Sequence, residues 1–311
     1  MTTDNNEFEF APDAVDQIDQ STVEGGGPRF PIIQWCSGDQ KAKKIGGMDY
    51  TGGFFVKDGA IDAELLTANG WSKTTMTHAD GSETEGYTRR EMAVSVIAYR
   101  QRWEVKTNGA PAQVFPWSKY EDAKQVGRPS GKTQVLVLVK GLEGIGPVVL
   151  TFTGTRAVSF LGSNKSSGAL TKFAQTVIAA ANFASDAAAK KAGKPAGKHW
   201  PYRCFWLPVG ANRAANGDPL FSEVGAGKDV SHVVLPVALG LPDKPDQVEL
   251  KKFYVGPDVM AMVNDLYAAN EDWRTAWENI IPGATDNGAT VAESAAESKD
   301  TDSAVLAAAG L

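Results

Sequence analysis

The chain has 311 residues, of which 42% are hydrophobic and 9% aromatic, and a formal net charge of −6. This is enough apolar material for a folded core, and 32 glycines and 16 prolines favour strands and turns over a helical bundle. No apolar run approaches the roughly 18 residues of a membrane-spanning helix, which argues against an integral membrane protein.

The compartment is predicted from the N-terminus and the cysteines. The acidic start lacks a basic-then-apolar signal segment, and Cys36 and Cys204 are far apart in the sequence. We therefore expect a cytoplasmic protein with free thiols.

Charge is distributed unevenly along the chain. Residues 1–28, the N-terminal tail, carry seven acids and no Lys or Arg, and residues 283–311, the C-terminal tail, carry five acids against Lys299. The remaining body has 30 basic and 25 acidic residues. We expect disordered acidic tails around a single β-rich domain over 29–282. The tails either compete for a basic groove or recruit protein partners, or they are acidic simply for solubility.

β-Branched runs, glycine turns and helical spacing predict the elements. In chain order these are strands over 30–35 and 53–57, a short helix or turn over 62–69, a polar loop over 78–87, a strand over 89–105, a loop over 109–131, a hairpin over 133–140 and 147–155, a helix over 169–192, strands over 202–209, 231–238 and 248–255, and a helix over 258–279. This order lacks βαβ alternation. It favours an α+β fold with a mostly antiparallel β body, either barrel-like or a curved sheet, and one or two packed helices.

Catalytic and metal signatures are weak. Residues 127–133 (GRPSGKT) have three residues where a phosphate-binding loop needs four, and a strand follows instead of a helix. The loop 78–87 gathers His78, Asp80, Glu83 and Glu85 without matching a calcium pattern, so an exposed polar turn is the simpler interpretation. Both cysteines lie in apolar runs typical of core residues. We therefore predict no enzyme activity, cofactor or metal.

Aromatic residues beside basic ones give the strongest functional signal. Residues 29–56 combine Trp35 with a lysine-rich turn and glycine pairs, and residues 89–105 place two arginines on one face at period two with Trp103 opposite. Proteins that bind single strands stack bases on such rings and neutralise phosphates with such cations. The predicted contacts are Trp35, Lys41, Lys43, Lys44, Tyr50, Phe54, Arg89, Arg90, Arg100, Arg102, Trp103, Trp117, Arg128 and Lys132.

The sequence therefore predicts a non-enzymatic protein that binds single-stranded nucleic acid, with DNA expected over RNA. In composition and element order it is similar to the single-strand binders carried by phages and plasmids, and no residue role is transferred from that similarity. The competing interpretation is a structural or assembly protein of a phage or mobile element that forms homo-oligomers through aromatic patches. A third is an enzyme on nucleic acid with a metal in the loop 78–87. For each single ring, burial in the core is the alternative.

Overall fold

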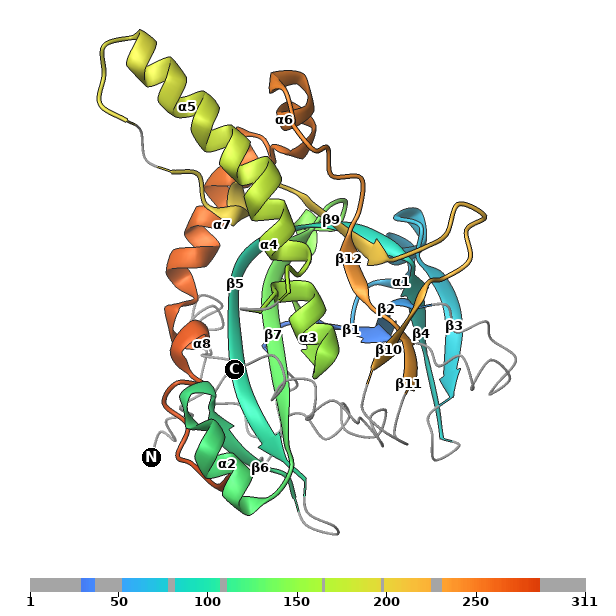
Figure 1. The fold of residues 1–311 in the computed structure, drawn as a ribbon. Coiled ribbons are helices and arrows are strands. Elements are labelled where there is room, and N and C mark those ends of the chain that lie inside the picture. The colour runs from blue at the N-terminus through green and yellow to red at the C-terminus, as the bar shows by residue number, and fades with distance from the viewer. Residues whose placement is uncertain are drawn as a thin grey trace, which may run out of the picture.

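The fold is that of a computed structural model, which describes residues 29–36, 52–77, 82–106, 111–163, 166–196, 199–224 and 231–285. Eleven strands form one sheet in the order β12-β9-β5-β7-β8-β1-β2-β4-β3, with β6 on β5 and β13 on β6 (Figure 1). They are β1 (Ile32–Cys36), β2 (Gly53–Lys57), β3 (Ser72–Thr77), β4 (Glu83–Arg89), β5 (Glu91–Val105), β6 (Gln113–Pro116), β7 (Pro129–Val139), β8 (Val148–Thr153), β9 (Leu207–Ala211), β12 (Pro236–Ala238) and β13 (Ala284–Thr285).

The sheet is mostly antiparallel and open. β1 and β8 pair in parallel, and the other pairs of described strands are antiparallel. The end strands β12 and β3 do not close the sheet into a barrel. β10 (Phe221–Val224) and β11 (Ser231–Val234) form a separate two-stranded sheet. The predicted α+β class with a mostly antiparallel sheet is confirmed, and of its two predicted forms, barrel-like or curved sheet, the sheet is not closed into a barrel.

Helices cover both faces of the sheet. They are α1 (Ala63–Ala68), η5 (Trp117–Lys119), α2 (Tyr120–Val126), η6 (Glu143–Ile145), α3 (Thr155–Leu161), α4 (Ala169–Phe173), the π-helix η7 (Ala174–Ile178), α5 (Ala179–Lys191), η8 (Tyr202–Cys204), α6 (Gln247–Phe253), α7 (Pro257–Ala269) and α8 (Glu271–Thr275). The larger core packs α3 to α5 on one face, and a second core packs α7 and α8 on the other. Figure 1 shows α3 to α5 in front of the sheet and α7 and α8 beside β5.

Several predicted elements are confirmed. The hairpin prediction corresponds to β7 and β8, which pair from Lys132↔Thr153 to Val137↔Val148. The strand predicted over 89–105 is β5, and the helix predicted over 169–192 is α4, η7 and α5 in succession. Apolar periodicity identified these elements because each spans many turns or pleats.

Other predictions were wrong. The strand predicted over 248–255 is mainly helix α6, because Asp246 accepts a hydrogen bond from the Glu249 amide while the Glu249 side chain accepts one from the Asp246 amide. The predicted polar loop 78–87 contains most of β4, the loop 109–131 contains β6, η5 and α2, and the C-terminal helix divides at Asn270. Strand β13 lies just past residue 282, where the domain was predicted to end, and residues 1–28 and 286–311 of the tails lie outside the described residues.

A β-bulge sets which side chains of β5 point to which core. The register with β7 shifts between Val96 and Ala98. Val94 and Val96 therefore belong to the larger core, whereas beyond the bulge the odd-numbered residues face that side. Gln101 and Trp103 follow Tyr99 on this face, and the arginines at 100 and 102 point to the other. The sequence prediction of two arginines opposite Trp103 is confirmed.

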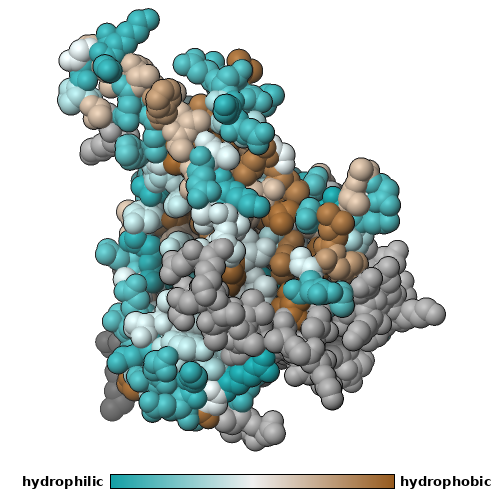
Figure 2. Space-filling view, in the orientation of Figure 1, coloured by the Kyte–Doolittle hydropathy of each residue, from teal (hydrophilic) through white to brown (hydrophobic). Residues whose placement is uncertain are grey.

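Helix α5 extends away from the body (Figure 1). After Ala181 it has no buried residue, and Phe183 is 77% exposed. Figure 2 shows that its free end is hydrophilic, while apolar side chains gather around β12. None of the helices in the described ranges has the length and apolar content needed to cross a membrane.

Candidate nucleic-acid interface

Three of the predicted base-stacking rings belong to the core. Trp35, Phe54 and Trp103 are 7%, 0% and 1% exposed. Trp35 packs edge-on against Phe54 at 4.9 Å between ring centroids, and its Nε1 donates a hydrogen bond to the Val234 carbonyl at 3.0 Å. Trp35 and Phe54 lie in the larger core, and Trp103 lies in a third core with Phe115 and Ala123, so the faces of these rings are occupied by protein. The prediction that they stack bases is corrected on this ground.

Two of the predicted phosphate contacts are buried around a carboxylate. Arg102 on β5 lies opposite Lys132 on β7, and both side chains are 7% exposed. Glu104 Oε1 lies 2.5 Å from Arg102 Nη2 and 3.4 Å from Lys132 Nζ. Burial alone would raise the pKa of Glu104, but the charges of Lys132 and Arg102 hold it below its ordinary value. These cations stabilise the sheet interior and do not form a surface groove.

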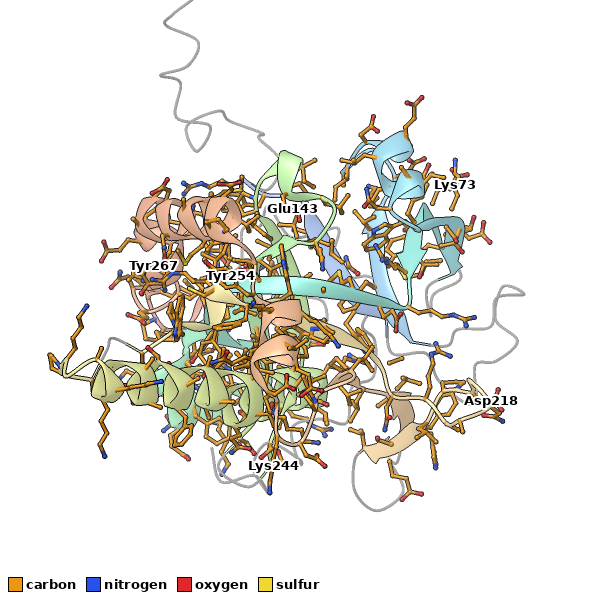
Figure 3. The ribbon with its side chains drawn as sticks, turned by 90° about the horizontal axis from the view of Figure 1, so that it is seen from above. Lys73, Glu143, Asp218, Lys244, Tyr254 and Tyr267 are labelled. Atoms are coloured by element: carbon orange, nitrogen blue, oxygen red, sulfur yellow. The ribbon has the colours of Figure 1, made fainter. Side chains whose placement is uncertain are left out.

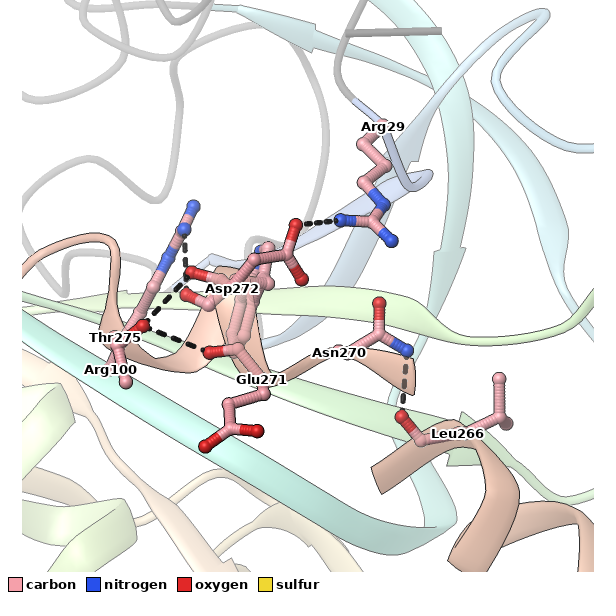
Figure 4. A network of polar contacts seen from close by, with 8 residues as sticks. Arg29, Arg100, Leu266, Asn270, Glu271, Asp272 and Thr275 are labelled. Carbon is pink, nitrogen blue, oxygen red and sulfur yellow. Dashed lines mark hydrogen bonds and ion pairs between the residues drawn. The ribbon is translucent and has the colours of Figure 1, made fainter. Parts of the chain in front are cut away.

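Arg100 is held by the C-terminal helices. Its guanidinium lies 4.2 Å from the Trp273 ring centroid and 4.4 Å from that of Trp277, and Arg102 lies 4.5 Å from the Trp277 ring. Arg100 also donates to the Trp273 carbonyl at 3.1 Å (Figure 4). It donates to Gln134 Oε1 on β7 as well. The predicted role of Arg100 at phosphates is replaced by one in fixing α8 to β5.

The remaining predicted cations are dispersed. Arg89, half-buried at the end of β4, donates to the Asn69 carbonyl, while Arg90 and Arg128 are exposed at separate turns. The other predicted contacts lie outside the described residues: Lys41, Lys43, Lys44 and Tyr50.

Trp117 is the predicted ring that keeps an accessible surface among those the structure describes. It is half-buried and stacks on Trp103 with ring centroids 4.1 Å apart and planes 7° apart. Trp103 Nε1 donates to the Trp117 carbonyl at 2.8 Å, which fixes both rings. Tyr120 packs against Trp103 at 4.9 Å. Trp103 is therefore a rigid support for Trp117.

A shallow hollow lies beside Trp117. Its volume is about 10 Å³, which is room for roughly one water molecule. Its lining residues come from β5, β7, η5 and α3 with its flanks: Gln101, Trp117, Gly131, Gly154, Ala157, Val158 and Gly162. The glycines leave backbone in place of side chains, and a Cβ at Gly131 would lie 3.1 Å from the Trp117 ring. The lining therefore combines one ring, one amide, glycine backbone and two small apolar side chains.

Two exposed tyrosines near this hollow were missed by sequence reasoning. Tyr99 on β5 is 49% exposed and Tyr202 on η8 is 39% exposed. Burial raises the pKa of Tyr202 above its ordinary value, and the nearby Tyr99 raises it further. The sequence predicts Tyr202 in a strand over 202–209, whereas the structure places it in η8. Tyr99 was detectable from the sequence, because period two from Trp103 places it on the same face of β5.

Arginine–tyrosine stacking anchors η8 to α7. The Arg203 guanidinium lies 4.3 Å from the Tyr267 ring centroid, and its Nε donates to Asn264 Oδ1 at 2.7 Å. The Arg274 guanidinium lies 3.9 Å from the same ring. Figure 3 places Tyr267 at the opposite end of the molecule from Lys73 on β3.

We call Tyr99, Gln101, Trp117 and Tyr202 the β5 track.

Other chemistry has little support in the described ranges. No group of three His, Cys, Asp or Glu side chains there is placed to hold a metal, and His78 and Asp80 lie outside those ranges. Gly127–Thr133 leads into β7, a strand, as the sequence predicts. Cys204 is a buried free thiol, and the half-buried Cys36 lies 3.6 Å from the Met76 sulfur.

The chain was compared with protein-family models, curated proteins and solved structures. No protein-family model, no curated protein and no solved structure matches the chain.

Proposed function

We propose that the protein binds single-stranded nucleic acid, DNA in the first instance, along the β5 track. The observation that carries the proposal is a set of three partly exposed rings next to one face of β5: Tyr99 on β5, Tyr202 on η8 and Trp117 on η5. The same face holds the Gln101 amide between them. This combination supports binding of bases through their flat faces, without chemistry on the strand.

The spacing of the track suits an extended strand. Side chains on one face of a β-strand recur about every 7 Å, so Tyr99 and Trp103, which supports Trp117, are about 14 Å apart. A single strand with splayed bases can place successive rings at such intervals. Each base stacked on an aromatic ring contributes roughly 1–3 kcal/mol.

One exposed cation lies near one end of the track. Arg128 precedes Pro129, which pairs with Val105 two residues beyond Trp103. Arg203, next to Tyr202 at the other end, is held by Tyr267 and Asn264. Each phosphate contact releases condensed counterions, so the observed affinity falls as salt rises. With few cations at the track, we expect a shallow salt dependence and an affinity set mainly by stacking.

The test is fluorescence anisotropy of labelled oligothymidylate with the wild type and with the Tyr99→Ala/Tyr202→Ala variant. Loss of two stacked rings predicts an affinity lower by roughly 30-fold or more, since each ring contributes at least about 1 kcal/mol. Phe183→Ala is the matched control, because Phe183 is an exposed ring on the projecting end of α5. Equal affinities for all three proteins, or no binding by the wild type, would overturn the proposal.

The second candidate is a structural or assembly protein of a phage or mobile element that self-associates. Exposed apolar side chains favour it: Phe183 on α5 is 77% exposed, Ile281 77% and Val248 on α6 66%. Isolated surface apolar residues are common, so this is weaker support than a set of rings. Light scattering over a concentration series without nucleic acid tests it. A mass that rises with concentration and falls in Phe183→Ala supports assembly.

A further inference from the structure

Helix α5 and the turn after it present an outward face that no described segment covers. The exposed side chains on this face recur at helical spacing and change from apolar to basic toward the free end: Ala179, Phe183, Ala187, Lys190, Lys191 and Lys194. Asn182 and Asp186 point to the other side, where Asn182 accepts a hydrogen bond from the Trp200 amide and Asp186 lies 4.0 Å from His199. Over its described length the outward face therefore carries three cations and no carboxylate.

The three lysines at the free end are held together and left unpaired. Gly193, at φ +67°, ends the helix, and the Lys194 amide donates to the Ala189 carbonyl at 2.9 Å, so Lys194 stays beside Lys190 and Lys191. None of the ion pairs between described residues involves these lysines. Phe183, two to three turns earlier, is 77% exposed. An exposed ring followed by cations fits a partner that is both apolar and acidic.

The C-terminal tail has the complementary order of residues. Glu293, Glu297 and Asp300 recur at helical spacing, and the apolar run AVLAAA over 304–309 follows them. Because α5 changes from apolar to basic and the tail from acidic to apolar, antiparallel packing brings unlike charges together and apolar groups together. In helical rise the lysines at 191 and 194 lie about 12–17 Å from Phe183, and Glu297 lies about 14 Å from Leu306.

The position of Thr285 decides which copy supplies this segment. Thr285 pairs with Gln113, and Gln113 pairs with Val105 at the end of β5. Figure 1 shows the free end of α5 at the opposite end of the molecule from β6. Val96 to Val105 extend over about 30 Å, and α5 extends about 18 Å more. The 12 residues from Thr285 to Glu297 span at most about 43 Å. The tail of the same chain therefore falls short of the lysines, whereas that of a second copy does not have this limit.

We propose that residues 293–311 of a second copy pack antiparallel on the outward face of α5, with their acids at the lysines and their apolar run at Phe183. This inference rests on the second candidate function and deepens it, because it names the contact through which copies associate. It does not depend on nucleic-acid binding. Exposed ion pairs are screened by salt, so the association should weaken as salt rises.

The experiment is light scattering over a concentration series of the full chain with two charge-reversal variants. The α5 variant is Lys190→Glu/Lys191→Glu/Lys194→Glu, and the tail variant is Glu293→Lys/Glu297→Lys/Asp300→Lys. Each variant alone is expected to associate more weakly than the wild type by at least roughly 3-fold, since three exposed ion pairs contribute at least about 1.4-fold each. An equimolar mixture of the two is expected to regain association, because each reversed site meets its complement on the other protein.

Controls separate this inference from the assembly function beneath it. The matched control reverses three exposed lysines away from α5 and should associate like the wild type: Lys57→Glu/Lys124→Glu/Lys140→Glu. Glutamine at the three α5 positions replaces glutamate if far-UV circular dichroism shows a loss of helix, and weaker association is again expected.

Three results would overturn the inference. Wild-type association that neither variant lowers overturns it and leaves the assembly function standing. Association that both variants lower but that mixing does not restore overturns the tail as the segment bound on α5. A wild-type mass that does not rise with concentration defeats both the inference and the assembly function.

Discussion

The buried carboxylate of Glu104 gives the sharpest test of the sheet interior. In Glu104→Gln the shape is kept, but the negative charge between Arg102 and Lys132 is lost. Those two cations lie opposite each other across β5 and β7, and their side chains are 7% exposed. Removing one partner of a buried ionic cluster costs about 3–5 kcal/mol. For a domain of this size the melting temperature should fall by roughly 6–20 °C.

The contribution of Glu104 to the free energy of unfolding should depend on pH. Because the folded-state pKa of Glu104 lies below its ordinary value of 4.5, its stabilisation is fully present above that value and is lost as pH falls through the folded-state pKa. Urea unfolding should therefore show a constant difference between wild type and Glu104→Gln near neutral pH and a shrinking one in acid. Glu121→Gln, on the exposed face of α2, is the matched control. A melting temperature for Glu104→Gln within about 1 °C of the control would refute the reasoning.

Three further predictions concern other parts of the chain. Trp277→Ala should lower the free energy of unfolding by about 3–5 kcal/mol in urea, because it removes a buried ring and its stacking with Arg100 and Arg102; a loss below about 1 kcal/mol would contradict the anchoring role. Burial raises the pKa of Cys204, so Ellman's reagent should modify the half-buried Cys36 first and Cys204 only after unfolding; equal rates in the native protein would argue against this. Deleting the N-terminal tail should tighten oligothymidylate binding at low salt, with a gain that shrinks as salt rises; an unchanged low-salt affinity would show that the tail does not compete.

The sequence predicted the elements whose pattern is local. The β7–β8 hairpin and the helix through α4 to α5 follow from runs of β-branched residues and from helical spacing. Helix α6 was missed because its apolar residues resemble a short strand, and the capping pair Asp246 and Glu249 was the decisive local signal.

The candidate site was predicted less well, because burial depends on distant segments. The sequence indicates that Arg100 and Trp103 point to opposite faces of β5, but not that the C-terminal Trp273 and Trp277 cover the arginine side. It also does not indicate that Tyr202 would lie beside Tyr99. Trp117, one of the predicted contacts, keeps accessible surface, and its stacking on Trp103 comes from packing between β5 and η5. Contacts between residues far apart in sequence decide which rings stay exposed.

Photo-crosslinking tests the central claim most directly, namely that bases lie on the β5 track. A 5-bromodeoxyuridine oligonucleotide is bound to the full chain and irradiated, and the modified peptides are identified by mass spectrometry. Adducts are expected at Tyr99, Tyr202 or Trp117, and they should be lost when unmodified oligothymidylate is added in excess. Adducts confined to residues away from the β5 track, on a chain that binds the strand, would contradict it.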